Sequence, residues 1–113
     1  MRLEEVVGRL ALSVRCGGEH LDRQVTGGYC GDLMSDVIAN AAPGALWITM
    51  QVHVNVIAVA LLKEIAGIVL VRGREPAPEA LLKAAEERIP VMVTDLPAFE
   101  IAGKLHALLA GGS

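Results

Sequence analysis

The chain has 113 residues, a length that suits one domain and leaves no room for separate catalytic and regulatory modules. Hydrophobic residues make up 53% and charged residues 20%, a balance that excludes intrinsic disorder. Because 10 Lys and Arg stand against 13 Asp and Glu, the formal net charge is −3, and aromatic residues are only 3%. A broad cationic or base-stacking surface, which nucleic acid or anionic lipid would need, is therefore not expected.

The chain is expected to be cytoplasmic. Glu4 and Glu5 stand near its start, which breaks the cationic-then-apolar order of a signal peptide. The longest apolar run, residues 56–62, falls far short of the roughly 20 residues that cross a bilayer, so no membrane span is expected. Cys16 and Cys30 are the two cysteines, and we expect reduced thiols in that compartment, a disulfide being the alternative.

The first third of the chain predicts one helix and two strands. Apolar residues at helical spacing predict a short amphipathic helix that buries Leu3, Val6, Val7 and Leu10. Alternating patterns then predict short strands over residues 11–15 and 24–30. The glycine-containing connection between these strands is too long for a tight hairpin.

A second helix is expected to begin at Asp32, whose carboxylate would cap it, and to end at Pro43-Gly44. Its predicted inward residues are Leu33, Val37 and Ile38. A compact apolar strand over residues 46–50 follows, and then a helix from about residue 54 to 65 with Gly67 as its C-terminal cap.

The last third predicts a buried strand over residues 68–71, a helix opened by Pro76 and Pro78, and a strand over 91–94. Pro97 then starts the final helix. The residues predicted to face inward are Leu81, Leu82, Ala85 and Ile89 on the first of these helices, and Phe99, Ala102, Leu105 and Leu109 on the second.

Alternating helices and continuously apolar strands predict an α/β fold, with a small, mostly parallel sheet flanked by helices. One domain is expected over residues 1–110, followed by a flexible tail over 111–113.

The predicted helix over residues 54–65 carries only three polar side chains, Asn55, Lys63 and Glu64. A helix that is apolar nearly all round has to be covered on most sides, and a small domain has few elements with which to do so. This pattern predicts a homodimer. The alternative is a central helix that neighbouring helices cover on its outer side.

Asp22-Arg23 and Thr26-Gly27-Gly28, followed by residues 32–36, resemble the DRTGG domain family, and residues 46–49, 53–60 and 99–103 extend the resemblance. Gln24 and Val25 interrupt the contiguous motif. The resemblance implies a fold like the N-terminal domain of HPr kinase/phosphorylase and, more distantly, that of muramyl-peptide ligases. Members accompany nucleotide-sensing CBS domains or phosphotransacetylase domains, which implies a regulatory or dimerising role. Kinase activity is excluded, because no Gly-x-x-x-x-Gly-Lys-Ser/Thr loop is present.

The residues of this motif have two interpretations. Glycines and Asp22 suit a scaffold, because glycine adopts positive φ and Asp accepts backbone N–H bonds. In the other interpretation the segment is a binding loop, in which Arg23 and Gly28 meet an anionic ligand or a second subunit.

Polar residues follow three predicted strands, where ligands of open α/β sheets usually bind. They are Gln51, His53, Asn55, Arg72, Arg74, Thr94 and Asp95. Together with the free amides of a helix N-terminus, they predict a site for a small anionic or nucleotide-like ligand. The alternative is that His53 or Asn55 caps a helix while Arg72 and Arg74 are solvated.

An enzyme would pair His53 as general acid or base with Asp95, but no Ser or Cys has a nucleophile's context. The spacing of Cys16 and Cys30 matches no zinc signature, so neither a metal nor a cofactor is expected. The sequence therefore favours a non-catalytic regulatory or dimerisation module, with a small enzyme or a purely structural dimer as the alternatives.

Overall fold

A computed structural model describes residues 1–111 of the chain. Its elements in chain order are α1 (Leu3–Arg9), β1 (Ser13–Cys16), the short 3-10 helix η1 (Gly18–His20), β2 (Gly27–Cys30), α2 (Met34–Asn40), β3 (Ala45–Thr49), α3 (Asn55–Leu62), β4 (Gly67–Leu70), α4 (Pro78–Glu86), β5 (Val91–Val93) and α5 (Ala98–Leu109). The α/β class is confirmed. Apart from Gly111, the predicted tail lies outside the described residues.

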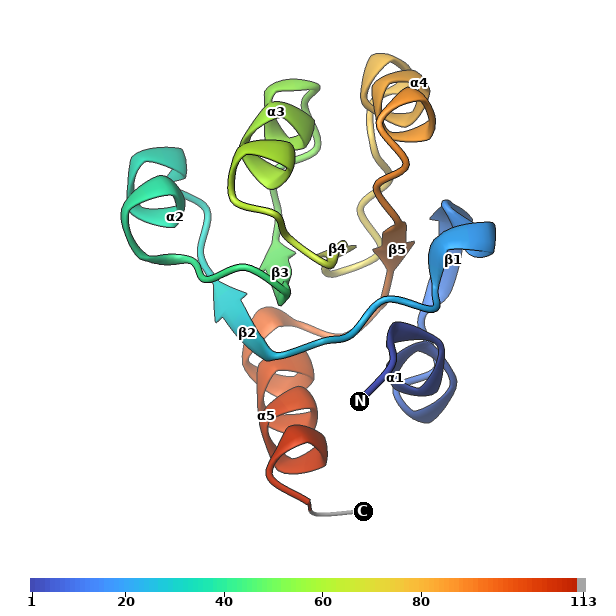
Figure 1. The fold of residues 1–113 in the computed structure, drawn as a ribbon, viewed down its shortest axis with the longest axis vertical. Helices are drawn as coiled ribbons and strands as arrows, with labels where there is room; N and C mark the ends of the chain where they lie inside the picture. Colours follow the sequence, from blue (N-terminus) through green and yellow to red (C-terminus); the bar gives the residue numbers. More distant parts are fainter. Residues whose placement is uncertain (112–113) are drawn as a thin grey trace.

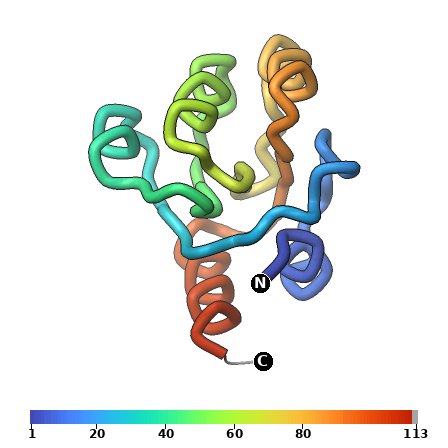
Figure 2. The backbone as a smooth tube through the Cα atoms, in the orientation of Figure 1, coloured from blue at the N-terminus to red at the C-terminus, as the bar shows by residue number. Residues whose placement is uncertain are grey.

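The five strands form one sheet in the order β1-β5-β4-β3-β2. Strands β2 to β5 run parallel, whereas β1 pairs antiparallel with β5, so the sheet is mixed rather than mostly parallel as expected. The first two strands occupy opposite edges, because the chain between them crosses the whole sheet (Figure 2). This crossing explains why their connection is longer than a hairpin.

Two layers of helices cover the sheet. Helices α2, α3 and α4 lie on one face, and α1 and α5 lie on the other (Figure 1). Each face has its own apolar core, since alternate side chains of the buried strands point to opposite sides. Trp47 of β3 is fully buried on the α3 face, and its indole N–H donates to Gly31 O at 2.9 Å.

Several helices turn a different face inward from the one predicted. Leu33 and Ile38 are 68% and 41% exposed, and α2 buries Val37. Leu82 on α4 is 69% exposed and Phe99 on α5 is 89% exposed. The buried residues of these two helices are Ala80 and Ala84 on α4, and Ile101, Leu105 and Leu108 on α5.

The predicted C-terminal cap at Gly67 is wrong. Helix α3 ends at Leu62, and Glu64 takes the left-handed backbone conformation there, with φ of 53°. Gly67 belongs to β4, where an added Cβ would stand 3.0 Å from Met92 Cε. Glycine at this position serves close packing under α1.

The two cysteines are free thiols on opposite edges of the sheet, so no disulfide joins them. Within residues 1–111, no helix is long and apolar enough to span a membrane.

Candidate functional site

Asp32 follows β2 and links its carboxyl end to that of β3 through hydrogen bonds. One oxygen, Oδ1, accepts hydrogen bonds from Thr49 Oγ1 and from the Met50 N–H, both at 2.8 Å. Gln51 Nε2 donates to the Asp32 carbonyl oxygen at 3.0 Å. The predicted capping role of Asp32 is therefore wrong: no side chain caps α2, and the carboxylate instead fixes the end of the neighbouring parallel strand.

The carboxyl ends of β4 and β5 form a second hydrogen-bonded group. The Arg72 N–H donates to Leu96 O at 3.0 Å, and the Gly73 N–H donates to Thr94 O at 2.8 Å. Arg72 and Gly73 both have positive φ, 55° and 67°, in a turn closed by the bond from Arg74 N–H to Val71 O. Positive φ at a non-glycine residue is uncommon and marks local strain.

Neither His53 nor Asn55 caps α3, whose N-terminal cap, Val54, has no side-chain hydrogen bond. Both side chains are exposed. Within residues 1–111 no hydrogen bond joins His53 to Asp95, and the cavity beside His53, between α3 and α4, measures only about 10 Å³. The structure thus brings the turn over residues 72–74 beside Thr94, Asp95 and Leu96, whereas within residues 1–111 no hydrogen bond joins this turn to His53 or Asn55.

Arg23 lies at the other end of the sheet, away from these residues. Its guanidinium donates to Arg88 O at 2.9 Å and to Ala66 O at 3.4 Å, which are backbone carbonyls just after α4 and just before β4. These bonds hold the crossing segment against the amino ends of the strands.

A surface ion pair stands next to the strand ends. Arg15 of β1 binds Glu75 through two hydrogen bonds, of 2.7 and 2.8 Å. These bonds hold the pKa of the Glu75 carboxyl below its usual range and raise the pKa of Arg15. Arg15 and Glu75 neutralise one another. Arg72 and Arg74 are exposed on either side of Gly73, and the Asp95 carboxylate lies beside this turn, since its Oδ1 would stand 3.1 Å from a Cβ added at Gly73. Within residues 1–111, no three acidic, His or Cys side chains gather as metal ligands would.

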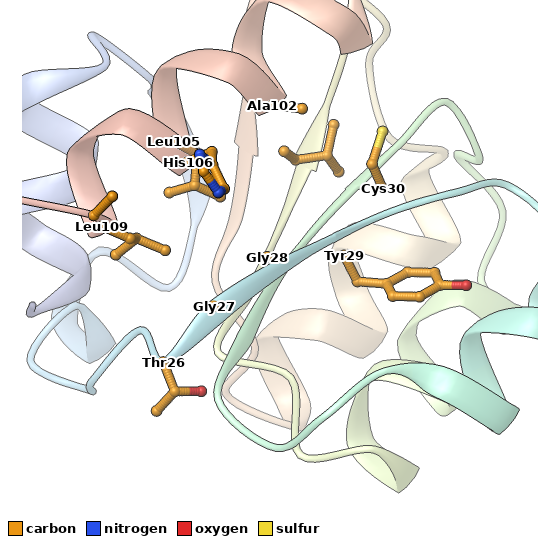
Figure 3. A pocket seen from close by; sticks show the side chains of 11 residues that line it. Thr26, Gly27, Gly28, Tyr29, Cys30, Ala102, Leu105, His106 and Leu109 are labelled. Atoms are coloured by element: carbon orange, nitrogen blue, oxygen red, sulfur yellow. The ribbon is translucent and has the colours of Figure 1, made fainter. Parts of the chain in front are cut away.

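Gly28 lies away from the strand ends, in a hollow of about 470 Å³ between β2 and α5 (Figure 3). An added Cβ at Gly28 would stand 2.8 Å from Leu105 Cδ2, so glycine allows α5 to approach the strand. The hollow is lined by Thr26, Gly27, Gly28, Tyr29, Cys30, Ile48, Ala102, Leu105, His106, Leu109 and Ala110.

Two features of these sites were not predicted from the sequence. Asp32 lies between a strand and a helix, so its carboxylate can either cap the helix, as predicted, or bond to the neighbouring strand, as it does here. The hollow between β2 and α5 was not predicted either, because it depends on how the helix packs on the strand and not on a local pattern in the sequence.

No family model matches this sequence, and no curated protein matches it. Among solved structures, the fold is similar to that of the CBS and DRTGG domains of the regulatory region of Clostridium perfringens pyrophosphatase, complexed with the activator diadenosine tetraphosphate. The TM-score is 0.70 at 15% sequence identity, over 92% of this chain. The match covers 45% of that chain, so this protein spans less than half of its length. The two share an α/β fold of the DRTGG-like kind.

Proposed function

We propose that this chain is a cytoplasmic, non-catalytic regulatory module of the DRTGG family that senses a small anionic or nucleotide-like ligand at the strand ends. The observation that carries the proposal is the fold shared with a regulatory region solved with a nucleotide activator. Asp22-Arg23 and Thr26-Gly27-Gly28 support it as residues typical of the family.

The strand ends offer the chemistry that a phosphate group needs. Arg72 and Arg74 are exposed on either side of Gly73, and guanidinium groups form charge-assisted bonds to phosphate oxygens. Arg72 is held in a strained backbone conformation by bonds to the loop after β5. A ligand bound here would favour one arrangement of the two loops, and the module would act by shifting that population.

Catalysis finds less support than binding. A general base works within hydrogen-bond reach of the proton that it removes, and substrates occupy pockets of hundreds of Å³. His53 has neither an orienting carboxylate within residues 1–111 nor a cavity larger than about 10 Å³ beside it.

A dimerising role is the second candidate function, and the outer surface of α3 favours it. Its exposed residues are the apolar Val54, Ala58, Leu61 and Leu62, with Asn55 the polar one at the N-terminal end. The leucines are 49% and 66% exposed. Contiguous apolar surface of this kind marks contact sites in soluble proteins, so we propose that two copies pair through these exposed apolar residues of α3.

Calorimetric titration with diadenosine tetraphosphate and with inorganic tripolyphosphate tests the sensing role. We expect both to bind, since the strand-end cations recognise phosphate. Arg74→Gln should weaken both about tenfold, the loss of one charge-assisted bond. Arg9→Gln, an exposed arginine on α1, is the matched control and should change neither affinity. Absence of binding by both compounds at millimolar concentration contradicts the proposal.

A further inference from the structure

The hollow between β2 and α5 has the size of a small-molecule site. Its volume of about 470 Å³ lies within the range of about 300 to 1,000 Å³ that ligand pockets occupy. None of its lining residues is Asp, Glu, Lys or Arg, and on α5 the apolar side chains of Ala102, Leu105 and Leu109 form one wall, with the His106 imidazole beside them (Figure 3). A ligand here would be largely uncharged, because no Lys, Arg, Asp or Glu lines the hollow to replace the water around an ion.

The other wall is an open strand edge. Strand β2 pairs with β3, and within residues 1–111 no strand pairs with its other side. In a parallel ladder the N–H and C=O of one residue point to one neighbour, and those of the next residue point the other way. Since the Gly31 N–H donates to Ile48 O on β3, the groups of Gly28 and Cys30 face the open edge. Both residues are exposed and line the hollow.

We propose that this hollow binds a neutral, planar heteroaromatic ring of nucleobase size. The ring's edge bonds to the open backbone groups of Gly28 and Cys30, and its face lies against Ala102, Leu105 and Leu109. This site is separate from the strand-end arginines, and it does not depend on them.

Together, the apolar wall on α5 and the open backbone edge of β2 favour a heteroaromatic ring over other ligands. An aliphatic ligand would cover the backbone N–H and C=O groups without bonding to them, and unsatisfied buried polar groups are unfavourable. A phosphate or carboxylate would lose its hydration with no Lys or Arg among the lining residues to meet it. A nucleobase satisfies both walls, because it carries adjacent donors and acceptors in its plane and presents apolar faces. An extended peptide could also add to the edge, but β2 offers only two outward-facing residues for a ladder.

Adenosine, which has the ring and no phosphate, is the probe. Titration should show saturable binding to the whole chain, and Ala102→Leu, which fills the hollow from α5, should weaken it about tenfold or more. Ala107→Leu is the matched control, because Ala107 is exposed on the same helix and does not line the hollow. It should leave the affinity unchanged.

Alkylation of the two thiols gives a second readout. Saturating adenosine should slow the reaction of Cys30, which lines the hollow, and leave that of Cys16 on β1 unchanged. The proposal is overturned if adenosine does not bind, if Ala102→Leu binds as tightly as the unmodified chain, or if only an apolar pentapeptide protects Cys30. Loss of tripolyphosphate binding alone would speak against the strand-end site and not against this one.

Discussion

Gly17 follows β1 in a left-handed conformation, with φ of 81°, and an added Cβ would stand 2.6 Å from Pro90 Cα. Because the nearest atoms are backbone atoms of Pro90, no side-chain rotation can relieve this contact. Gly17→Ala should therefore lower the free energy of unfolding by about 2 to 4 kcal/mol. Gly103 on α5 has nothing within 4 Å of an added Cβ, so Gly103→Ala should raise stability by about 0.5 to 1 kcal/mol. Urea denaturation of both variants measures the contrast, and equal effects would contradict it.

The cysteines should react slowly at neutral pH. Burial raises the pKa of the Cys16 thiol, and burial together with the charge of Asp32 raises that of Cys30. Since the thiolate is the nucleophile, alkylation by iodoacetamide at pH 7 should be slower than that of a free cysteine. The difference should shrink as the pH rises through the raised pKa values. Because the unfolded thiols ionise first, stability should fall over that same rise. Alkylation rates measured over a range of pH, on the folded chain and on the urea-unfolded chain, test whether the folded thiols react more slowly.

Helix α4 offers a matched pair of neighbouring alanines. Ala84 is fully buried against the sheet, whereas Ala85 is exposed. Ala84→Leu should destabilise the fold by about 1 to 3 kcal/mol, because the core has no room for the larger side chain. Ala85→Leu should stay within about 0.5 kcal/mol, as exposed substitutions usually do. Thermal unfolding distinguishes the two, and a reversed order would mean that α4 packs through the face predicted from the sequence.

Apolar runs, prolines and glycines mark the helices and strands in the sequence, and part of their inward faces was predicted: Val37 on α2 and Leu105 on α5 are buried. Periodicity favours the largest apolar side chains as inward, and so also selects Leu82 and Phe99, which are exposed. The buried residues of α4 are instead the small Ala80 and Ala84, which belong to the same core as strand residues such as Ile68 and Val91. Side-chain size alone therefore does not show which face of a helix packs on the sheet.

The candidate site was predictable only in part, because the positions of its residues depend on the order of the strands in the sheet. Arg72 bonds to Leu96 and Gly73 bonds to Thr94 because β4 and β5 are neighbours, as their sequence order suggests. Arg23 lies at the opposite end because the segment that carries it crosses the sheet between its two edge strands. No local pattern encodes that crossing, since it follows from the antiparallel pairing of β1 with β5.

At the scale of the whole molecule, α3 occupies the middle of its layer, between α2 and α4 (Figure 1). This subunit therefore covers part of the helix, as the central-helix alternative expects, and the pairing of two copies remains a proposal for the exposed side. Val56, Ile57, Val59 and Ala60 are buried within this one subunit. The side facing away from the sheet keeps Leu61 and Leu62 exposed. Whether a second copy is needed to cover α3 therefore depends on the size of this exposed side and not on the hydrophobicity of the whole helix.

If two copies pair through this exposed side of α3, light scattering after size-exclusion chromatography should give twice the chain mass of 11.9 kDa. Leu62→Lys should return the chain to the monomer mass, because it places a charge in the apolar contact, and it should leave the fold intact, since the side chain is 66% exposed. Leu82→Lys on α4 is the control: its leucine is 69% exposed but lies outside the exposed side of α3, so this variant should remain a dimer. A monomer mass for the unmodified chain at micromolar concentration would leave the ligand site to act within one subunit. A dimer that survives Leu62→Lys would place the contact on another surface.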